Sequence, residues 1–168
     1  MADNPQVSWT ARLRDPRFRT IFFFGMASGL PSSLVFATLS IWLREEGVSR
    51  TSIGLIGAAA TPYAINFLWA PFVDKFRLGR LQIALGQRRS WIFACQALLI
   101  PAVVAMGLQN PQSGAVVLGL CALAVSTLSA TQDVAIDAYR IEILEPHEYG
   151  AGAALAIYGW HTGAFVTG

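Results

Sequence analysis

The stretch GAVVLGLCALAVSTLSATQDVAIDAYR, residues 114–140, decides the fold of this chain. Its apolar part has about the length of a helix that crosses a bilayer, which takes ~20 residues. Its last part carries Asp133, Asp137 and Arg140 at helical spacing. An ionisable group at the bilayer centre costs on the order of 2.5–3.5 kcal/mol on insertion scales, and a function must offset that cost. The stretch therefore indicates a membrane-spanning helix whose charged side chains belong to a transport pathway.

The composition of the whole chain agrees with a membrane protein. Of its 168 residues, 54% are hydrophobic and only 13% are charged, which is about half the charged share of a soluble domain. The net charge of +2 is small, and no basic face stands apart from the membrane-flanking positions, so nucleic-acid binding is excluded. Cys95 and Cys121 lie inside apolar runs, as buried thiols do, and form no metal-ligand motif. We expect no cofactor and no metal.

Five apolar segments divide the chain. They lie at about residues 18–43, 53–73, 91–108, 115–138 and 150–168. In lipid only helices and closed barrels satisfy the backbone, and these segments lack the alternation of a barrel. We predict an all-α membrane protein with about five transmembrane helices.

The segments also predict a domain organisation. Residues 1–17 form a cytoplasmic N-terminal segment, and residues 18–168 form one transmembrane helical domain. The last segment is still apolar at Gly168, so we expect a truncated part of a longer protein. A small complete protein with a short last helix is the alternative.

Basic residues predict the orientation. Ten of the 12 Lys and Arg residues lie on the side of the N-terminus, if the chain crosses the membrane at each segment. The other side has only Arg44 and Arg50. Because basic residues accumulate in cytoplasmic loops, we place the N-terminus in the cytoplasm.

Two apolar segments contain residues that bend helices or bring them close together. Gly25 and Gly29 form a GxxxG pattern, and Pro31 follows at once. Glycine admits a neighbouring backbone and proline bends a helix, so this helix either flexes beside a cavity or simply packs closely. Pro62 and Asn66 place a second kink and a polar group in the second segment, as in helices that line a cavity.

The polar stripe of the fourth segment supplies the candidate proton-coupling groups. Asp133 and Asp137 are one helical turn apart, and Arg140 lies three residues beyond Asp137. A carboxylate near a like charge in a low dielectric takes up a proton readily, which a proton-coupled carrier needs. The alternative for these residues is an interfacial set of ion pairs, with Asp137 and Arg140 nearer the loop and Asp133 deeper in the helix. His161 is either a substrate or proton group or a helix-packing histidine.

Several motifs together resemble the AmpG-type muropeptide permeases of the major facilitator superfamily. They are GLP at 29–31, TLSIWLRE at 38–45, FLWAPFVD at 67–74, GQRRSW at 86–91 and ATQDVAIDAYRIE at 130–142. The resemblance implies part of an N-terminal six-helix bundle in the bacterial inner membrane. It also implies proton-driven import of anhydromuropeptides, which are GlcNAc-anhydroMurNAc peptides, for peptidoglycan recycling. The remaining helices of the same transporter would then be partners of this chain, together with the substrate, protons and the lipid bilayer.

The resemblance assigns roles to further residues. Asp74, Arg88 and Arg89 are similar to the cytoplasmic gate motif of the superfamily, although Ala70 replaces its leading glycine. A plain basic loop facing the lipid surface is the alternative.

Four more residues are predicted to act on the substrate or to move the helices that surround it. Gln132 and Asn66 are candidates for hydrogen bonds to the substrate, and Gly29 with Pro31 for helix flexing. These assignments describe a carrier and not an enzyme.

Other functions stay open. An acetyl-CoA-like or other solute carrier of the same superfamily is one alternative. A membrane-embedded enzyme that uses the two aspartates is another, and a non-functional fragment is the third.

Overall fold

The computed structural model describes residues 9–112 and 114–168, and within them it is helical without any β-strand. The predicted all-α fold class is confirmed. The helices, including short 3₁₀ and π segments labelled η, follow in this order: α1 Trp9–Arg14, α2 Pro16–Ser33, η1 Leu34–Thr38, α3 Leu39–Glu45, α4 Arg50–Gly57, η2 Ala58–Ala60, α5 Thr61–Ile65, η3 Asn66–Leu68, α6 Ala70–Lys75, α7 Arg80–Leu85, α8 Gln87–Gly107, α9 Ala115–Ile143, η4 Pro146–Glu148 and α10 Tyr149–Thr167.

The first long helix runs from α2 through η1 into α3 and contains a π-helical turn. Asp15 caps its start by accepting a hydrogen bond from the Arg17 backbone N–H at 2.8 Å. Pro31 lies inside α2 and has no N–H to donate, and the π-turn Leu34–Thr38 follows within one helical turn. A π-turn next to a proline relieves the backbone mismatch that the proline creates. The Pro31 region is therefore irregular but continuous.

The second long segment is broken into short helices. Ser49 caps α4, and 3₁₀ turns at η2 and η3 then separate α4, α5 and α6. Pro62 and Pro71 occupy the first turns of α5 and α6, the positions where a missing N–H costs least. The kink expected near Pro62 is present, and Asn66 begins the 3₁₀ turn η3.

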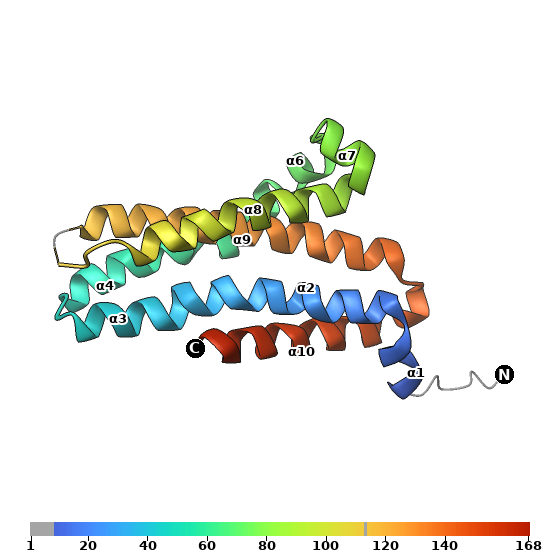
Figure 1. Ribbon diagram of the computed structural model, residues 1–168, viewed down its shortest axis with the longest axis horizontal. Coiled ribbons are helices and arrows are strands. Elements are labelled where there is room, and N and C mark those ends of the chain that lie inside the picture. Colours follow the sequence, from blue (N-terminus) through green and yellow to red (C-terminus); the bar gives the residue numbers. More distant parts are fainter. Residues whose placement is uncertain (1–8, 113) are drawn as a thin grey trace.

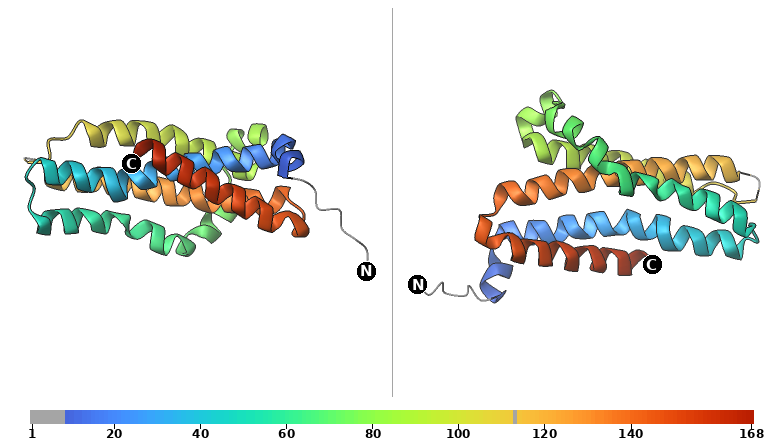
Figure 2. Two further views of the ribbon diagram at one scale, coloured as in Figure 1. Left: turned by 90° about the horizontal axis from the view of Figure 1, so that it is seen from below. Right: turned by 180° about the vertical axis from the view of Figure 1, so that it is seen from behind.

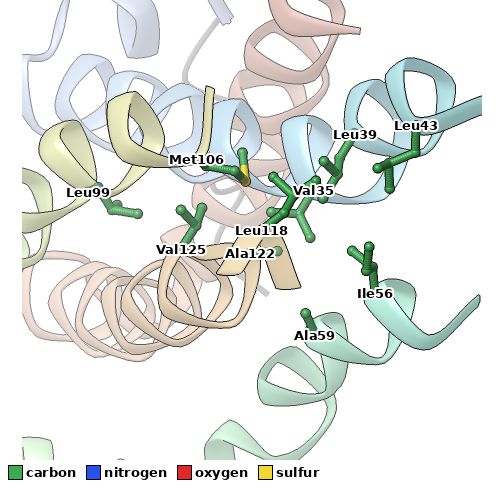
Figure 3. Packing of buried hydrophobic residues seen from close by; sticks show 10 residues of the cluster. All are labelled: Val35, Leu39, Leu43, Ile56, Ala59, Leu99, Met106, Leu118, Ala122 and Val125. Carbon is green, nitrogen blue, oxygen red and sulfur yellow. The ribbon is translucent and has the colours of Figure 1, made fainter. Parts of the chain in front are cut away.

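The helix α9 lies at the centre of the bundle. Leu118, Ala122 and Val125 are completely buried on it. They pack against α2–α3, α4–η2 and α8 in a cluster of ten buried residues: Val35, Leu39, Leu43, Ile56, Ala59, Leu99, Met106, Leu118, Ala122 and Val125 (Figure 3). This cluster anchors one end of the bundle around α9.

Among the residues that the structure describes, four helical stretches are long and apolar enough to cross a membrane. They are Pro16–Glu45, Arg50–Leu68, Gln87–Gly107 and Ala115–Ile143. Their outer surfaces carry large exposed apolar side chains such as Leu55, Ile100 and Val116, which suit a lipid environment. The fifth predicted span corresponds to α10, which has the length but is outside this set and lies along α2 (Figure 1). Its glycines and its Tyr, Trp, His and Thr residues lower its hydropathy.

The long helices lie side by side, so the connections gather at two ends. Figures 1 and 2 show α1, α7 and the α9–α10 connection at one end, and the α3–α4 and α8–α9 connections at the other. The first end contains most of the Lys and Arg residues. The charge asymmetry of the sequence is thus an asymmetry between the two ends of the bundle.

Candidate functional site

A cavity of about 220 Å³ lies between α2, α9 and α10. Its lining residues are Gly25, Ser28, Asp133, Ile136, Asp137, Arg140, Ala156, Ile157 and Trp160. The fold therefore brings Asp133, Asp137 and Arg140, three candidate residues of the sequence, to one hollow. Ser28 and Trp160 add a hydroxyl and an aromatic side chain from two other helices. This cavity is the candidate functional site.

The three charged residues of the cavity differ in burial. Nη2 of Arg140 lies 3.0 Å from Oδ1 of Asp137, one helical turn away, and Asp137 is 64% exposed. Asp133 lies deeper, and its Oδ1 atom is buried. Asp137 thus has a cationic partner at the edge of the cavity, whereas the carboxylate of Asp133 faces the interior. The geometry thus separates Asp133 from the Asp137–Arg140 pair.

Glycines determine how closely α10 approaches α2 beside the cavity. A Cβ atom on Gly29 would lie 2.1 Å from the Trp160 carbonyl oxygen, and one on Gly25 would lie 2.3 Å from that of Ala156. The contact is reciprocal, because Cβ atoms on Gly159 and Gly163 would lie 2.1 Å and 2.3 Å from carbonyl oxygens of α2. Such backbone contact is possible only with small residues. Of the two interpretations of the GxxxG pattern, close helix packing is what the structure displays at Gly29.

The predicted substrate residues are scattered. Gln132 is completely buried on α9, whereas Asn66 is half-buried at the start of η3. Pro31 is buried and lines a second, mainly apolar hollow between α2 and α8. His161 is exposed on α10 with its ring 5.0 Å from that of Trp160. The 220 Å³ cavity that contains Asp133 is not lined by any of these four residues.

The predicted gate residues form a polar network at the end of the bundle where α8 begins. Arg88 donates through Nη1 to the carboxylate of Asp74, which lies in α6. It also donates through Nε to Oε1 of Glu142 at 2.8 Å. Arg89 donates to the Tyr139 hydroxyl at 2.8 Å, and its guanidinium lies 5.3 Å from the centre of that ring. The network joins α6, α8 and α9 despite the altered spacing of the motif.

A second network, which the sequence did not reveal, joins α2 to the segment before α10. Arg17 bonds to Asp15 through Nη2 at 2.8 Å and to Glu148 through Nη1 at 3.0 Å, and it donates to the carbonyl oxygen of Ile143 at 3.2 Å. The hydrogen bond from the Arg17 side chain lowers the pKa of Asp15. The pKa of Glu148 is lowered first by the hydrogen bond from the Glu145 backbone N–H and then by the hydrogen bond from Arg17. The available signals were an Asp-Pro start at 15–16 and a capping box from Glu145 to Glu148.

These features define a class of protein. A chain with four helical stretches that can span a bilayer, and a charged cavity between its helices, is a multi-pass membrane protein with the character of a transporter. Comparison with known proteins then identifies the family.

Residues 18–167 match the family described as acetyl-coenzyme A transporter 1. The chain is 33% identical over 159 residues to putative transporter AmpG 4 of Rickettsia felis, covering 95% of this chain and 38% of that protein. It is 34% identical over 155 residues to the anhydromuropeptide permease of Escherichia coli K12, covering 92% of this chain and 31% of the permease. The chain therefore belongs to this transporter family of the major facilitator superfamily, and it is similar to AmpG-type transporters. It spans about a third of the length of the curated relatives it matches.

Proposed function

We propose that this chain forms part of a proton-coupled transporter that imports anhydromuropeptides across the bacterial inner membrane. The observation that carries the proposal is the cavity in which α9 presents Asp133, Asp137 and Arg140 to α2 and α10. The name of the Escherichia coli relative, an anhydromuropeptide permease, supports the substrate. The basic end of the bundle, which includes the N-terminal helix, would face the cytoplasm.

Within this proposal the residues have distinct tasks. Asp133 binds and releases the coupled proton, because it is the deeper carboxylate of the cavity. Asp137 and Arg140 hold each other until substrate or a conformational change separates them. Asp74, Arg88 and Arg89 hold α6, α8 and α9 together at the cytoplasmic end when the transporter is closed on that side.

The remaining candidates surround the pathway. Gln132 and Asn66 would offer amide groups to sugar or peptide groups of the substrate, and His161 would offer its imidazole from α10. Gly29 and Pro31 would permit small movements between α2 and α10. The remaining helices of the transporter would complete the pathway.

A second candidate substrate comes from the family description, which names acetyl-coenzyme A. An anionic thioester of a nucleotide would need cationic groups, and the cavity offers only Arg140. The muropeptide, with many hydroxyl and amide groups, matches the mixture of carboxylate, hydroxyl and indole side chains better.

The experiment is uptake into right-side-out membrane vesicles that contain the protein expressed from its complete reading frame. We expect labelled anhydromuropeptide to accumulate when the outside is acidified, and a protonophore to abolish the accumulation. Labelled acetyl-CoA should not enter. Accumulation of acetyl-CoA without muropeptide uptake would overturn the proposed substrate, and muropeptide uptake that ignores the protonophore would overturn proton coupling.

A further inference from the structure

Unpaired polar atoms gather along one part of α9. In residues 9–112 and 114–168, seven buried side-chain polar atoms have no hydrogen-bond partner, and all but one belong to this region. They are Ser126 Oγ, Ser129 Oγ, both polar atoms of the Gln132 amide, Oδ1 of Asp133, and the Tyr63 hydroxyl of α5. We refer to Ser126, Ser129, Gln132 and Asp133 as the α9 polar row.

The α9 polar row differs from the other hydroxyls of the same helix. Thr127 and Thr131 each donate to the carbonyl oxygen four residues before them, at 2.7 Å. Ser126 and Ser129 make no such bond, and Gln132 has no exposed surface at all. Buried polar groups in folded proteins nearly always have a partner, and internal water supplies it where protein groups do not. A concentration of unpaired groups at one place therefore marks a binding site for small polar molecules.

The row extends from the cavity into the bundle. Asp133 lines the cavity, and Ser126 lies seven residues earlier on α9, or ~10 Å along the helix axis. The Tyr63 hydroxyl of α5 lies against Ser129 and within electrostatic range of Asp133. The row thus leads from Asp133 away from the basic end of the bundle.

We propose that the α9 polar row and Tyr63 bind a file of water molecules that carries protons between Asp133 and solvent at the end of the bundle opposite the basic end. Water and hydroxyl groups each donate and accept, so they can satisfy the serines, the tyrosine and both ends of the Gln132 amide. In each transfer the water beside Asp133 gives a proton to its carboxylate and receives one from the next water or hydroxyl. One proton therefore enters the file for each proton that reaches Asp133.

Only the proton-carrying role rests on the proposed function; the binding of water does not. The titratable or charged groups that face Asp133 from the packed helices are Tyr63 of α5, Cys95 of α8, and Asp137 and Arg140 of α9. Of these, only Tyr63 lies along the file beside the serines of the row.

The first test measures stability in detergent and does not require transport. Ser126→Ala and Ser129→Ala are compared with Ser90→Ala, since Ser90 is equally buried but donates to the Gln87 carbonyl oxygen at 2.8 Å. If water occupies the row, both variants lower the melting temperature as Ser90→Ala does, because each removes a hydroxyl that has a hydrogen-bond partner. If the row is dry, removal of an unpaired hydroxyl leaves the melting temperature unchanged or raises it, and the proposal is wrong. Stabilisation of the wild type by Na⁺, lost in both variants, would also overturn it in favour of a bound cation.

The second test addresses the proton role in vesicles. Tyr63→Phe should slow gradient-driven uptake several-fold and shift its pH dependence, while the half-saturating substrate concentration stays unchanged. Tyr158→Phe is the matched control, because Tyr158 is 65% exposed on α10. Uptake by Tyr63→Phe that equals the wild type at every pH would overturn the proton role. If wild-type vesicles show no gradient-driven uptake, the proposed function fails, and the stability test still decides whether the row binds water.

Discussion

Arg17 and Glu148 join the start of α2 to the segment before α10 across 131 residues of the chain, with Nη1 and Oε2 3.0 Å apart. Only 14% of the Glu148 side chain is exposed. The same two helices are in backbone contact through their glycines. The α2–α10 pair is thus held by an ion pair at one end and by small residues along its length.

The ion pair predicts a dependence of stability on pH. The pKa of Glu148 is lowered in the folded protein, first by the Glu145 backbone N–H and then by Arg17, so the stabilisation is present above its ordinary pKa of about 4.3. As the pH falls through the lower folded-state pKa, the carboxylate is protonated and the stabilisation is lost. Glu148→Gln should lower the melting temperature by about 2–4 °C at pH 7, the shift that about 1 kcal/mol causes in a chain of this size. The difference from the wild type should shrink steadily as the pH falls below the ordinary pKa of Glu148, and a difference that stays constant or grows on acidification would contradict this account.

The glycine contact predicts a strong position dependence for added methyl groups. Gly29→Ala and Gly159→Ala place a Cβ atom 2.1 Å from a backbone carbonyl oxygen, so the helices must separate. We expect a loss of about 1–3 kcal/mol of stability, the usual cost of overpacking. Gly54→Ala is the control, because nothing lies within 4 Å of its added Cβ atom. Thermal melting in detergent should show a lower midpoint for the first two variants and an equal or higher one for Gly54→Ala; three equal midpoints would exclude the close contact.

The gate network predicts a non-additive result. Arg88 has two carboxylate partners, Asp74 and Glu142, so either partner alone can still hold it. Both are about half exposed, and each single neutralisation, Asp74→Asn or Glu142→Gln, should cost less than about 1 kcal/mol. The double variant should lose more than the sum of the two, because Arg88 then has no anionic partner in the network. A double-mutant cycle on melting temperature and on uptake measures this, and strictly additive losses would show that the two carboxylates act independently.

The fold class could be predicted from the sequence because lipid leaves the backbone few choices. Long apolar segments that have few charges and no alternation form helices in a bilayer. Pro62 indicates where the second segment is broken into shorter helices. The π-turn after Pro31 could not be predicted, since a proline is equally compatible with a kinked α-helix.

The site was predictable only where its residues share one helix. Asp133, Asp137 and Arg140 are spaced by four and three, so any α-helix brings them to one side. Ser28 and Trp160 come from α2 and α10, and no local spacing links them to α9. The pairing of α2 with α10 was also hidden, because GxxxG identifies a contact face but not its partner. Long-range packing, rather than local pattern, completes the cavity.

The most direct test of the central claim compares Asp133→Asn with Asp137→Asn in vesicles that contain the protein from its complete reading frame. Asp133→Asn should abolish accumulation of labelled anhydromuropeptide driven by a proton gradient, yet preserve exchange of labelled for unlabelled substrate without a gradient. Asp137→Asn, which leaves Asp133 in place and frees Arg140, should weaken accumulation but keep its response to the gradient. Accumulation by Asp133→Asn that equals the wild type and still rises with the proton gradient would contradict the account.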